Sequence, residues 1–210
     1  ITYKTTVMKI KALLFSLFVT GSSLAGAQDI NLPTPQKQGG DPIMQTLSER
    51  KSTREFDTTK EIAPQDLSNL LWAAWGYNRE DKRTAPSAMN RQEMSLYVIT
   101  AQGAYLYDAK QNLLKEIAKG DFRKSAGMQP FAQTAPLNII FVADLDKAPG
   151  NDMMFVDCGF ISQNIYLYSA SAGLGTVVRG SFDGEELAKV LKLTDRQKVL
   201  LTQTVGYPAQ

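Results

Sequence analysis

The sequence has no histidine and only one cysteine among its 210 residues. Without imidazole, no Ser-His-Asp or Cys-His catalytic arrangement can form, and neither can a zinc site built on histidine. A single cysteine can form neither an intrachain disulfide nor a CxxC redox pair. Any proton transfer must therefore use carboxylates, lysine, tyrosine, water or a bound cofactor.

The chain also lacks a strong charge of either sign. It has 23 basic and 21 acidic residues, a net charge of +2, with 43% hydrophobic and 21% charged residues. These are ordinary values for a globular protein long enough to bury a core, so disordered and fibrous classes are disfavoured. Asp144, Asp146 and Asp152 are too scattered to indicate a metal site, and we expect none.

The first part of the chain has the features of an export signal. Two lysines follow Met8, an apolar run covers residues 12–19, and small residues occupy positions 25–27. The apolar run is far shorter than the roughly 20 residues of a membrane-spanning helix. The pattern predicts a signal peptide cleaved before Gln28, and residues 1–7 are interpreted as translated sequence upstream of the initiator. We therefore expect a periplasmic or secreted protein.

The remainder is expected to form one domain. Removal of residues 1–27 leaves a net charge of −1, which gives no support to a nucleic-acid-binding surface. Residues 28–40 contain two prolines and two glycines and predict a flexible linker. No second linker, repeat or low-complexity run interrupts residues 41–210.

Hydrophobic periodicity predicts a mixture of helices and strands without strict βαβ alternation, which indicates the α+β class. The long helix expected near the middle is apolar almost all round, so we expect its own domain or a partner chain to enclose it. Helices are predicted from Asp41-Pro42, from Pro64 to Gly76, over 113–118 and 152–172, and after capping boxes at Asp183/Glu186 and Thr194/Gln197. Strands are predicted over 94–99, 104–107, 137–143, 176–178 and 200–205.

Three stretches could carry chemistry. In the first, Arg50, Lys51, Ser52 and Arg54 gather cations and a hydroxyl where a helix passes into an extended segment. Guanidinium forks with a hydroxyl or backbone N–H suit a phosphate. A solvated helix end, where basic residues favour the carboxyl terminus, explains the same residues. Composition alone favours this second interpretation.

The second stretch covers residues 83–92 and the third residues 173–180. The proline, serine and asparagine of the second are either turn residues or a loop that faces a planar heterocycle. The third lacks the last glycine of a dinucleotide fingerprint and follows a helix, so it does not predict a Rossmann site. Gly180 could allow a backbone N–H to approach a flat ligand closely.

Taken together and in this order, these motifs resemble the nitroreductase family of FMN-dependent oxidoreductases. The resemblance runs from about Met44 to Tyr207. Its components are RKSTREF at 50–56, PSAMNRQ at 86–92, DCGFISQNIYL at 157–167, GLGTVVRGSFD at 173–183 and VGYP at 205–208.

The resemblance implies an α+β homodimer, with a central mixed or antiparallel sheet flanked by helices and two FMN sites at the subunit interface. Arg50, Lys51 and Ser52 would hold the phosphate and ribityl chain, and Arg54 would approach the pyrimidine edge. The other contacts implied are Pro86, Ser87, Ala88 and Asn90 from the partner subunit, and Gln129, Val178, Arg179 and Gly180, with the Gly180 N–H directed at flavin N5.

The activity implied is a ping-pong, two-electron reduction of a nitro, quinone or similar small acceptor through flavin N5. Reduction of FMN places negative charge near N1, which a fixed cation such as Arg54 would stabilise. We assign no side chain as general acid or base. NAD(P)H is a possible electron donor, although it is not freely available outside the cytoplasm.

Two other interpretations stay open. The LLWAAWGYN segment at 70–78, followed by Arg83 and the APSA run, resembles the azoline-oxidase branch of the family, which passes electrons to oxygen. A non-catalytic ligand-binding scaffold is the other. Two features motivate it: the expected address outside the cytoplasm, and the end of the sequence at Gln210, where many relatives continue with basic residues that contact phosphate.

Overall fold

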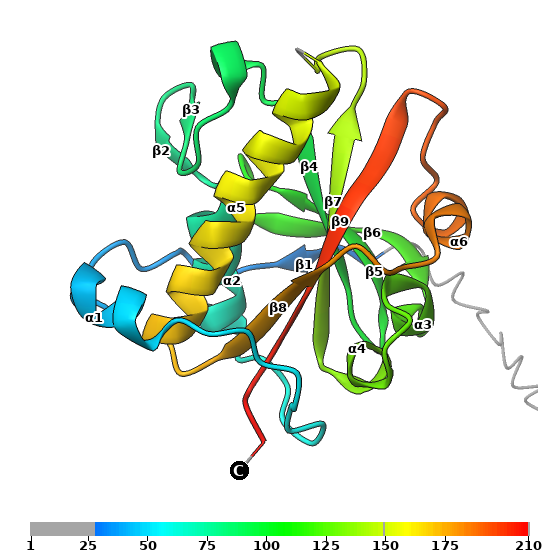
Figure 1. Cartoon of the computed structure of the whole chain (residues 1–210). Helices are drawn as coiled ribbons and strands as arrows, with labels where there is room; N and C mark the ends of the chain where they lie inside the picture. The colour runs from blue at the N-terminus through cyan, green and yellow to red at the C-terminus, as the bar shows by residue number, and fades with distance from the viewer. Residues whose placement is uncertain (1–27, 149, 210) are drawn as a thin grey trace, which may run out of the picture.

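An antiparallel sheet of seven strands, in the order β1-β6-β5-β4-β7-β9-β8, runs through the protein (Figure 1). The structure is a computed structural model that describes residues 28–148 and 150–209. The predicted signal peptide and its cleavage site lie outside these residues. The strands of the sheet are β1 (Ile30–Asn31), β4 (Met94–Ile99), β5 (Gly103–Asp108), β6 (Leu113–Lys119), β7 (Leu137–Asp144), β8 (Gly175–Arg179) and β9 (Gln197–Gly206).

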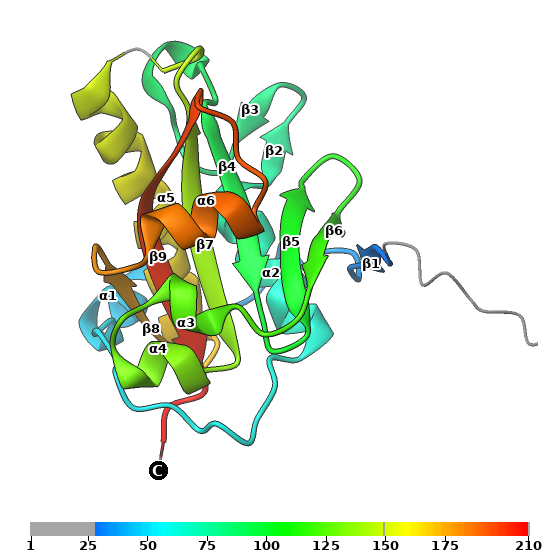
Figure 2. The ribbon, with the colours of Figure 1, turned by 90° about the vertical axis from the view of Figure 1, so that its right-hand side faces the viewer.

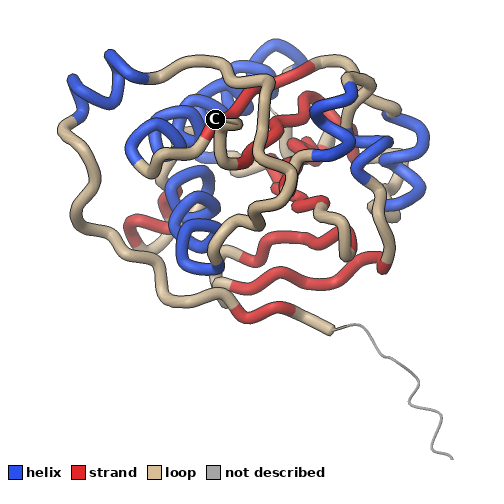
Figure 3. Tube along the Cα trace, turned by 90° about the horizontal axis from the view of Figure 1, so that it is seen from below, coloured by secondary structure: helices blue, strands red, loops and turns tan. Residues whose placement is uncertain are grey.

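Helices cover both faces of this sheet, as the views in Figures 2 and 3 show. A small separate hairpin, β2 (Tyr77–Arg79) with β3 (Lys82–Arg83), and a short 3-10 helix, η1 (Ala88–Asn90), follow α2. The α-helices are α1 (Ile43–Glu49), α2 (Pro64–Trp75), α3 (Arg123–Ala126), α4 (Pro130–Thr134), α5 (Asn151–Ser171) and α6 (Gly184–Val190).

The alternation of side chains along the strands explains the layers. Leu96 and Val98 of β4 pack in one core cluster with α2 and α5, whereas Tyr97 and Ile99 pack in a second cluster with α3 and α6. β7 is buried on both faces and is therefore apolar nearly throughout, as predicted. The α+β class and the antiparallel sheet flanked by helices are thus confirmed.

One predicted helix is a strand. Residues 113–118, expected as a helix, form β6 and pair antiparallel with β5. The turn before β6 explains the error, since the Asp108 carboxylate accepts two backbone N–H bonds at 3.0 Å, and Asn112 adopts a left-handed φ of 52°. This turn closes a hairpin, and tertiary pairing overrides the helix propensity of the segment.

The predicted helix caps have mixed outcomes. Asp183 caps α6 by accepting a 2.9 Å bond from the Glu186 N–H. Thr194 and Gln197 also bond to each other, at 3.1 Å, but they close a turn from which β9 starts, so the expected helix there is wrong. At α1, Asp41 makes no side-chain cap and Pro42 precedes the first helical residue.

Residues 28–40 lie against the domain, which corrects the expectation of a flexible linker. Ile30 pairs with Leu114 at the edge of the sheet. Further along, the Gln36 N–H donates to the Asn69 side chain at 2.8 Å. Backbone donors and acceptors at an edge strand favour such pairing, and composition alone does not reveal it.

Within the described residues, no helix combines the length and the apolar character that crossing a membrane requires.

Candidate active site

The predicted phosphate segment follows directly on α1 and runs beside the start of β8. Ser52 forms a parallel bridge with Thr176, and the Thr53 N–H donates to the Thr176 carbonyl at 2.9 Å. Lys51 and Thr53 line a cavity of about 400 Å³, which Tyr166 of α5 also lines.

Tyr166 of α5 joins this segment to β8. Its hydroxyl lies 3.0 Å from the Ser52 Oγ and accepts a 3.1 Å bond from the Val178 N–H. The Arg50 guanidinium carbon lies 5.2 Å from the centre of the tyrosine ring, within cation–π range. The sequence alone does not single out this tyrosine, and its contacts with Ser52 and Val178 show what the hydroxyl does.

A second segment, residues 127–129, reaches the end of β8. The Met128 N–H donates to the Ser181 carbonyl at 3.3 Å. The Gln129 Oε1 is buried and, within the described chain, has no hydrogen-bond partner. Gly180 is exposed, and a Cβ built on it would meet nothing within 4 Å. The open backbone at Gly180 and the unpartnered Gln129 oxygen therefore belong to two segments that are hydrogen-bonded to each other.

The Arg179 side chain points away from this place and into the protein. It is 6% exposed, and its guanidinium donates to the Ala126 carbonyl, the Asn138 Oδ1 and the Thr204 Oγ1 at 3.1, 2.8 and 2.6 Å. Burial lowers the pKa of Arg179 to about 10, so it stays charged at neutral pH. A Cβ on Gly127 would lie 1.8 Å from this guanidinium, so that position requires glycine. Only the backbone of Arg179 remains for a ligand.

The predicted ring-facing loop lies near the other end of α5. The Ala88 N–H donates to the Asp157 carboxylate at 2.8 Å, and the Ser87 Oγ accepts from the Gln92 N–H at 3.0 Å. Asp157 and Tyr166 are nine residues apart on one helix, which corresponds to about 14 Å along its axis. The structure thus gathers residues 50–54, 127–129 and 178–180, whereas it places Pro86, Ser87, Ala88 and Asn90 elsewhere.

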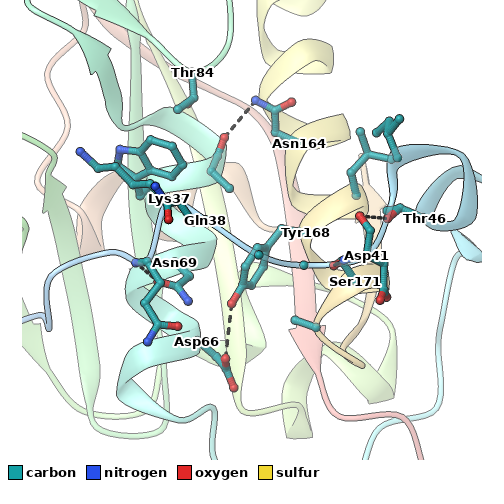
Figure 4. A pocket seen from close by; sticks show the side chains of 18 of the residues that line it. Lys37, Gln38, Asp41, Thr46, Asp66, Asn69, Thr84, Asn164, Tyr168 and Ser171 are labelled. Carbon is teal, nitrogen blue, oxygen red and sulfur yellow. Dashed lines mark hydrogen bonds between the residues drawn. The ribbon is translucent and has the colours of Figure 1, made fainter.

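A cavity of about 550 Å³ lies apart from these residues. It lies between residues 36–41, α2 and α5, and no predicted site residue lines it (Figure 4). Some of its polar groups are already bonded: the Tyr168 hydroxyl donates to Asp66 at 3.3 Å, and Asn164 donates to the Ala73 carbonyl at 2.9 Å. The Thr84 hydroxyl, which also lines it, is buried and has no hydrogen-bond partner within the described residues.

The gathered residues fit a phosphorylated, planar ligand. Two guanidinium groups and a hydroxyl within residues 50–54 suit a phosphate and a polyol. The unobstructed backbone at Gly180 suits a flat ring. Among residues 28–148 and 150–209, no group of three or more acidic or cysteine side chains could hold a metal ion.

Comparison with known proteins identifies the class. The model of the nitroreductase family matches residues 47–207. A protein of Methanocaldococcus jannaschii, provisionally named a nitroreductase, is 29% identical over 177 residues, covering 76% of this chain and 88% of the relative. The "FMN reductase [NAD(P)H]" of Bacillus subtilis is 26% identical over 187 residues, covering 80% of this chain and 66% of that protein.

A solved structure agrees with the sequence comparison. The crystal structure of a provisionally named nitroreductase from Ralstonia eutropha superimposes with a TM-score of 0.80 at 39% identity, over 87% of this chain and 90% of that one. The chain therefore belongs to the nitroreductase family. This confirms the resemblance noted in the sequence and, with it, the enzyme class, an FMN-dependent oxidoreductase.

Proposed function

We propose that the protein is exported and catalyses the two-electron reduction of a nitro, quinone or similar small acceptor, with FMN held at the interface of a homodimer. The observation that carries this proposal is that Arg50 and the Ser52 hydroxyl both contact Tyr166, whose hydroxyl also accepts from the Val178 N–H, two residues before the open backbone of Gly180. When bound, FMN supplies the redox chemistry through N5, taking electrons from a donor and passing them to an acceptor in ping-pong order.

The chain's own residues bind and orient that group. Arg50 and the Ser52 hydroxyl offer charge-assisted bonds to a phosphate, and Arg54 offers a fixed positive charge to the edge of the ring. Tyr166 holds Ser52 and Val178 together, because its hydroxyl bonds to both. The Gly180 N–H is free to donate to a ring nitrogen. No side chain is assigned a proton transfer.

Exposed apolar side chains on α1 and α5 support the homodimer. A monomer seldom leaves such a surface on neighbouring helices, and α1 packs beside α5. The structure places the loop at residues 86–90 away from the predicted site of its own chain. In a homodimer, this loop would instead lie at the site of the other subunit. The side chains, each at least 40% exposed, are Ile43, Met44 and Leu47 on α1 and Met153, Phe155, Val156 and Phe160 on α5.

An absorbance scan of protein purified without added flavin tests the proposal. We expect a flavin spectrum that bleaches with dithionite or NADH, and a dimer by size-exclusion chromatography. The double variant Arg50→Ala/Arg54→Ala should bind FMN at least about tenfold more weakly, because it loses two charge-assisted contacts. The exposed Arg196→Ala serves as the matched control. Colourless protein that FMN does not reconstitute would contradict the proposal.

The same samples separate the two alternatives. Oxygen consumption with a heterocyclic or peptide substrate, and no turnover of nitro or quinone acceptors, would favour an oxidase of the azoline-forming type. Unchanged biological function in the double variant, despite lost flavin, would favour a non-catalytic scaffold.

Export needs its own experiment, since it rests on the sequence features before Gln28. Cell fractionation with N-terminal sequencing should find a chain that begins at Gln28 outside the cytoplasm. An uncleaved cytoplasmic protein would overturn this part and restore NAD(P)H as the ready donor.

A further inference from the structure

Glu93 is a carboxyl group inside the protein without a cation. It is 1% exposed, follows the loop at residues 86–92 and immediately precedes β4. Neither carboxyl oxygen has a hydrogen-bond partner within the described chain. Its backbone carbonyl accepts a 2.9 Å bond from the Asp144 N–H, so β7 fixes its position. A buried carboxylate without donors is costly, and the group favours its neutral form.

A second buried carboxyl, that of Asp157 on α5, interacts with the Glu93 side chain. Asp157 is 2% exposed and accepts the 2.8 Å bond from the Ala88 N–H. Burial, as the larger cause, and the neighbouring Asp157 together raise the pKa of Glu93 to about 7. A proton on Glu93 is favoured here because two close carboxyls cannot both ionise cheaply.

The charged groups nearby do not neutralise this pair. From α5, the buried Cys158 thiol also faces Glu93, and burial raises its pKa above the ordinary range. On the loop side, Arg83 bonds to Gln92 and the Trp75 carbonyl. On β7, Asp144 pairs with Lys147. Among the salt bridges of the described residues, none includes either carboxyl of the pair.

The loop that these carboxyls flank is strained. Met89, Asn90 and Gln92 have φ values of 51°, 54° and 49°, the left-handed region that costs non-glycine residues about 1 kcal/mol or more each. Such a backbone persists only when contacts hold it. Here the contacts at its ends are Ala88 to Asp157 and Gln92 to Ser87.

We propose that Glu93 and Asp157 share one proton and act as positioning residues that hold the loop at residues 86–92 in its strained conformation. This inference rests on the proposed function for its consequence, because that loop would line the flavin of the partner subunit. Loss of the proton places two like charges in a buried site, which loosens the loop and weakens flavin binding. The pair touches neither cofactor nor substrate.

The loop can be followed directly by NMR. In flavin-free protein, the Ala88 amide resonance should titrate with a midpoint near pH 7, because its acceptor changes its electrostatic surroundings there. Glu93→Gln, which keeps the neutral shape, should remove that titration. Glu80→Gln, an exposed glutamate on the β2–β3 turn, is the matched control and should titrate like the wild type. An Ala88 amide that does not shift between pH 5.5 and 8.5 would overturn the proposal.

Flavin binding gives the second measurement. From pH 6.5 to 8.5, the wild type and Glu80→Gln should lose about tenfold in FMN affinity, whereas Glu93→Gln should change less than about twofold. An equal loss in Glu93→Gln would refute the pair's role.

If the Ala88 amide titrates but no FMN binds at any pH, the pair stands and the proposed function fails. If Glu93→Gln does not fold, ¹³C titration of the wild-type Glu93 carboxyl decides, a midpoint near 4.5 contradicting the proposal.

Discussion

Arg179 and Glu93 are both ionisable residues buried inside the protein, and their surroundings differ. The guanidinium of Arg179 donates to three neutral oxygens. The carboxyl of Glu93 has no partner for either oxygen within the described residues. A guanidinium cannot give up its proton at neutral pH, so it must be surrounded by acceptors. A carboxyl can take up a proton and become neutral, so it survives without donors.

The two sites should therefore respond differently to substitution and to pH. The Arg179 network responds to substitution and hardly to pH, because the pKa of Arg179 remains about 10. The Glu93 site is expected to respond to pH near neutrality, because the pKa of Glu93 is about 7. Arg179 thus anchors the end of β8 at the predicted flavin site, whereas the proposed anchor of the loop at residues 86–92 is titratable.

Removal of the guanidinium should have the largest effect. Arg179→Met leaves three buried oxygens without their donor, which we expect to cost on the order of 3 kcal/mol in the free energy of unfolding. Urea denaturation followed by circular dichroism measures it. Arg196→Met, which breaks an exposed salt bridge to Asp146, should leave the midpoint almost unchanged. A loss below 1 kcal/mol for Arg179→Met would mean that the network is not structural.

The pH dependence of stability should be the next largest effect. Glu93 has a pKa of about 7 in the folded protein against 4.5 in the unfolded chain, so the folded state binds more protons between these values. Stability must then fall as pH rises through this window, by on the order of 2 kcal/mol, and the loss is complete above about pH 7. Thermal unfolding of the wild type and Glu93→Gln at pH 5 and 8 measures the difference.

The direction in which stability changes with pH distinguishes a neutral buried carboxyl from an ionised one. Glu93→Gln should be less sensitive to pH than the wild type and relatively more stable at pH 8. A wild type that gains stability from this residue as pH rises would contradict a neutral buried carboxyl.

Removal of the Tyr166 hydroxyl, which bonds to Ser52 and to β8, should have a smaller effect. Tyr166→Phe removes the bonds to Ser52 and to the Val178 N–H, which should cost about 1 kcal/mol of stability and weaken FMN binding several-fold. Tyr168→Phe removes a hydroxyl bonded to Asp66, away from the predicted site, and is the matched control. Equal FMN affinity in both variants would separate Tyr166 from the site.

The smallest effect concerns the thiol beside the carboxyl pair. Cys158 is buried, and both burial and Glu93 raise its pKa. We therefore expect negligible labelling of the folded protein by iodoacetamide at pH 8, and complete labelling in denaturant. Rapid labelling of the native protein would show that this end of α5 opens easily.

Local pattern predicted the long elements well. α5 and β7 are long or apolar enough that no alternative structure could bury them, and both were found within a few residues of the predicted bounds. The errors fall where the pattern is short. Residues 113–118 form a strand because the preceding turn places them beside β5, with which they pair. Within residues 28–40, Ile30 and Asn31 pair with the edge of the sheet, which composition does not reveal.

The ordered motifs of the chain were enough for the family and the class of enzyme, because residue types at set spacings reflect the cofactor's chemistry. Which of those residues meet depended on packing. Ser52 bonds to Tyr166 because α5 lies against its segment, and Arg179 enters the core because three oxygens from distant segments converge on it. Glu93 and Asp157, 64 positions apart, became a pair only when α5 crossed the sheet. Contacts between distant positions leave no periodic pattern in a single sequence. These contacts determine the pKa values of Glu93 and Arg179 and the strained conformation of the loop at residues 86–92.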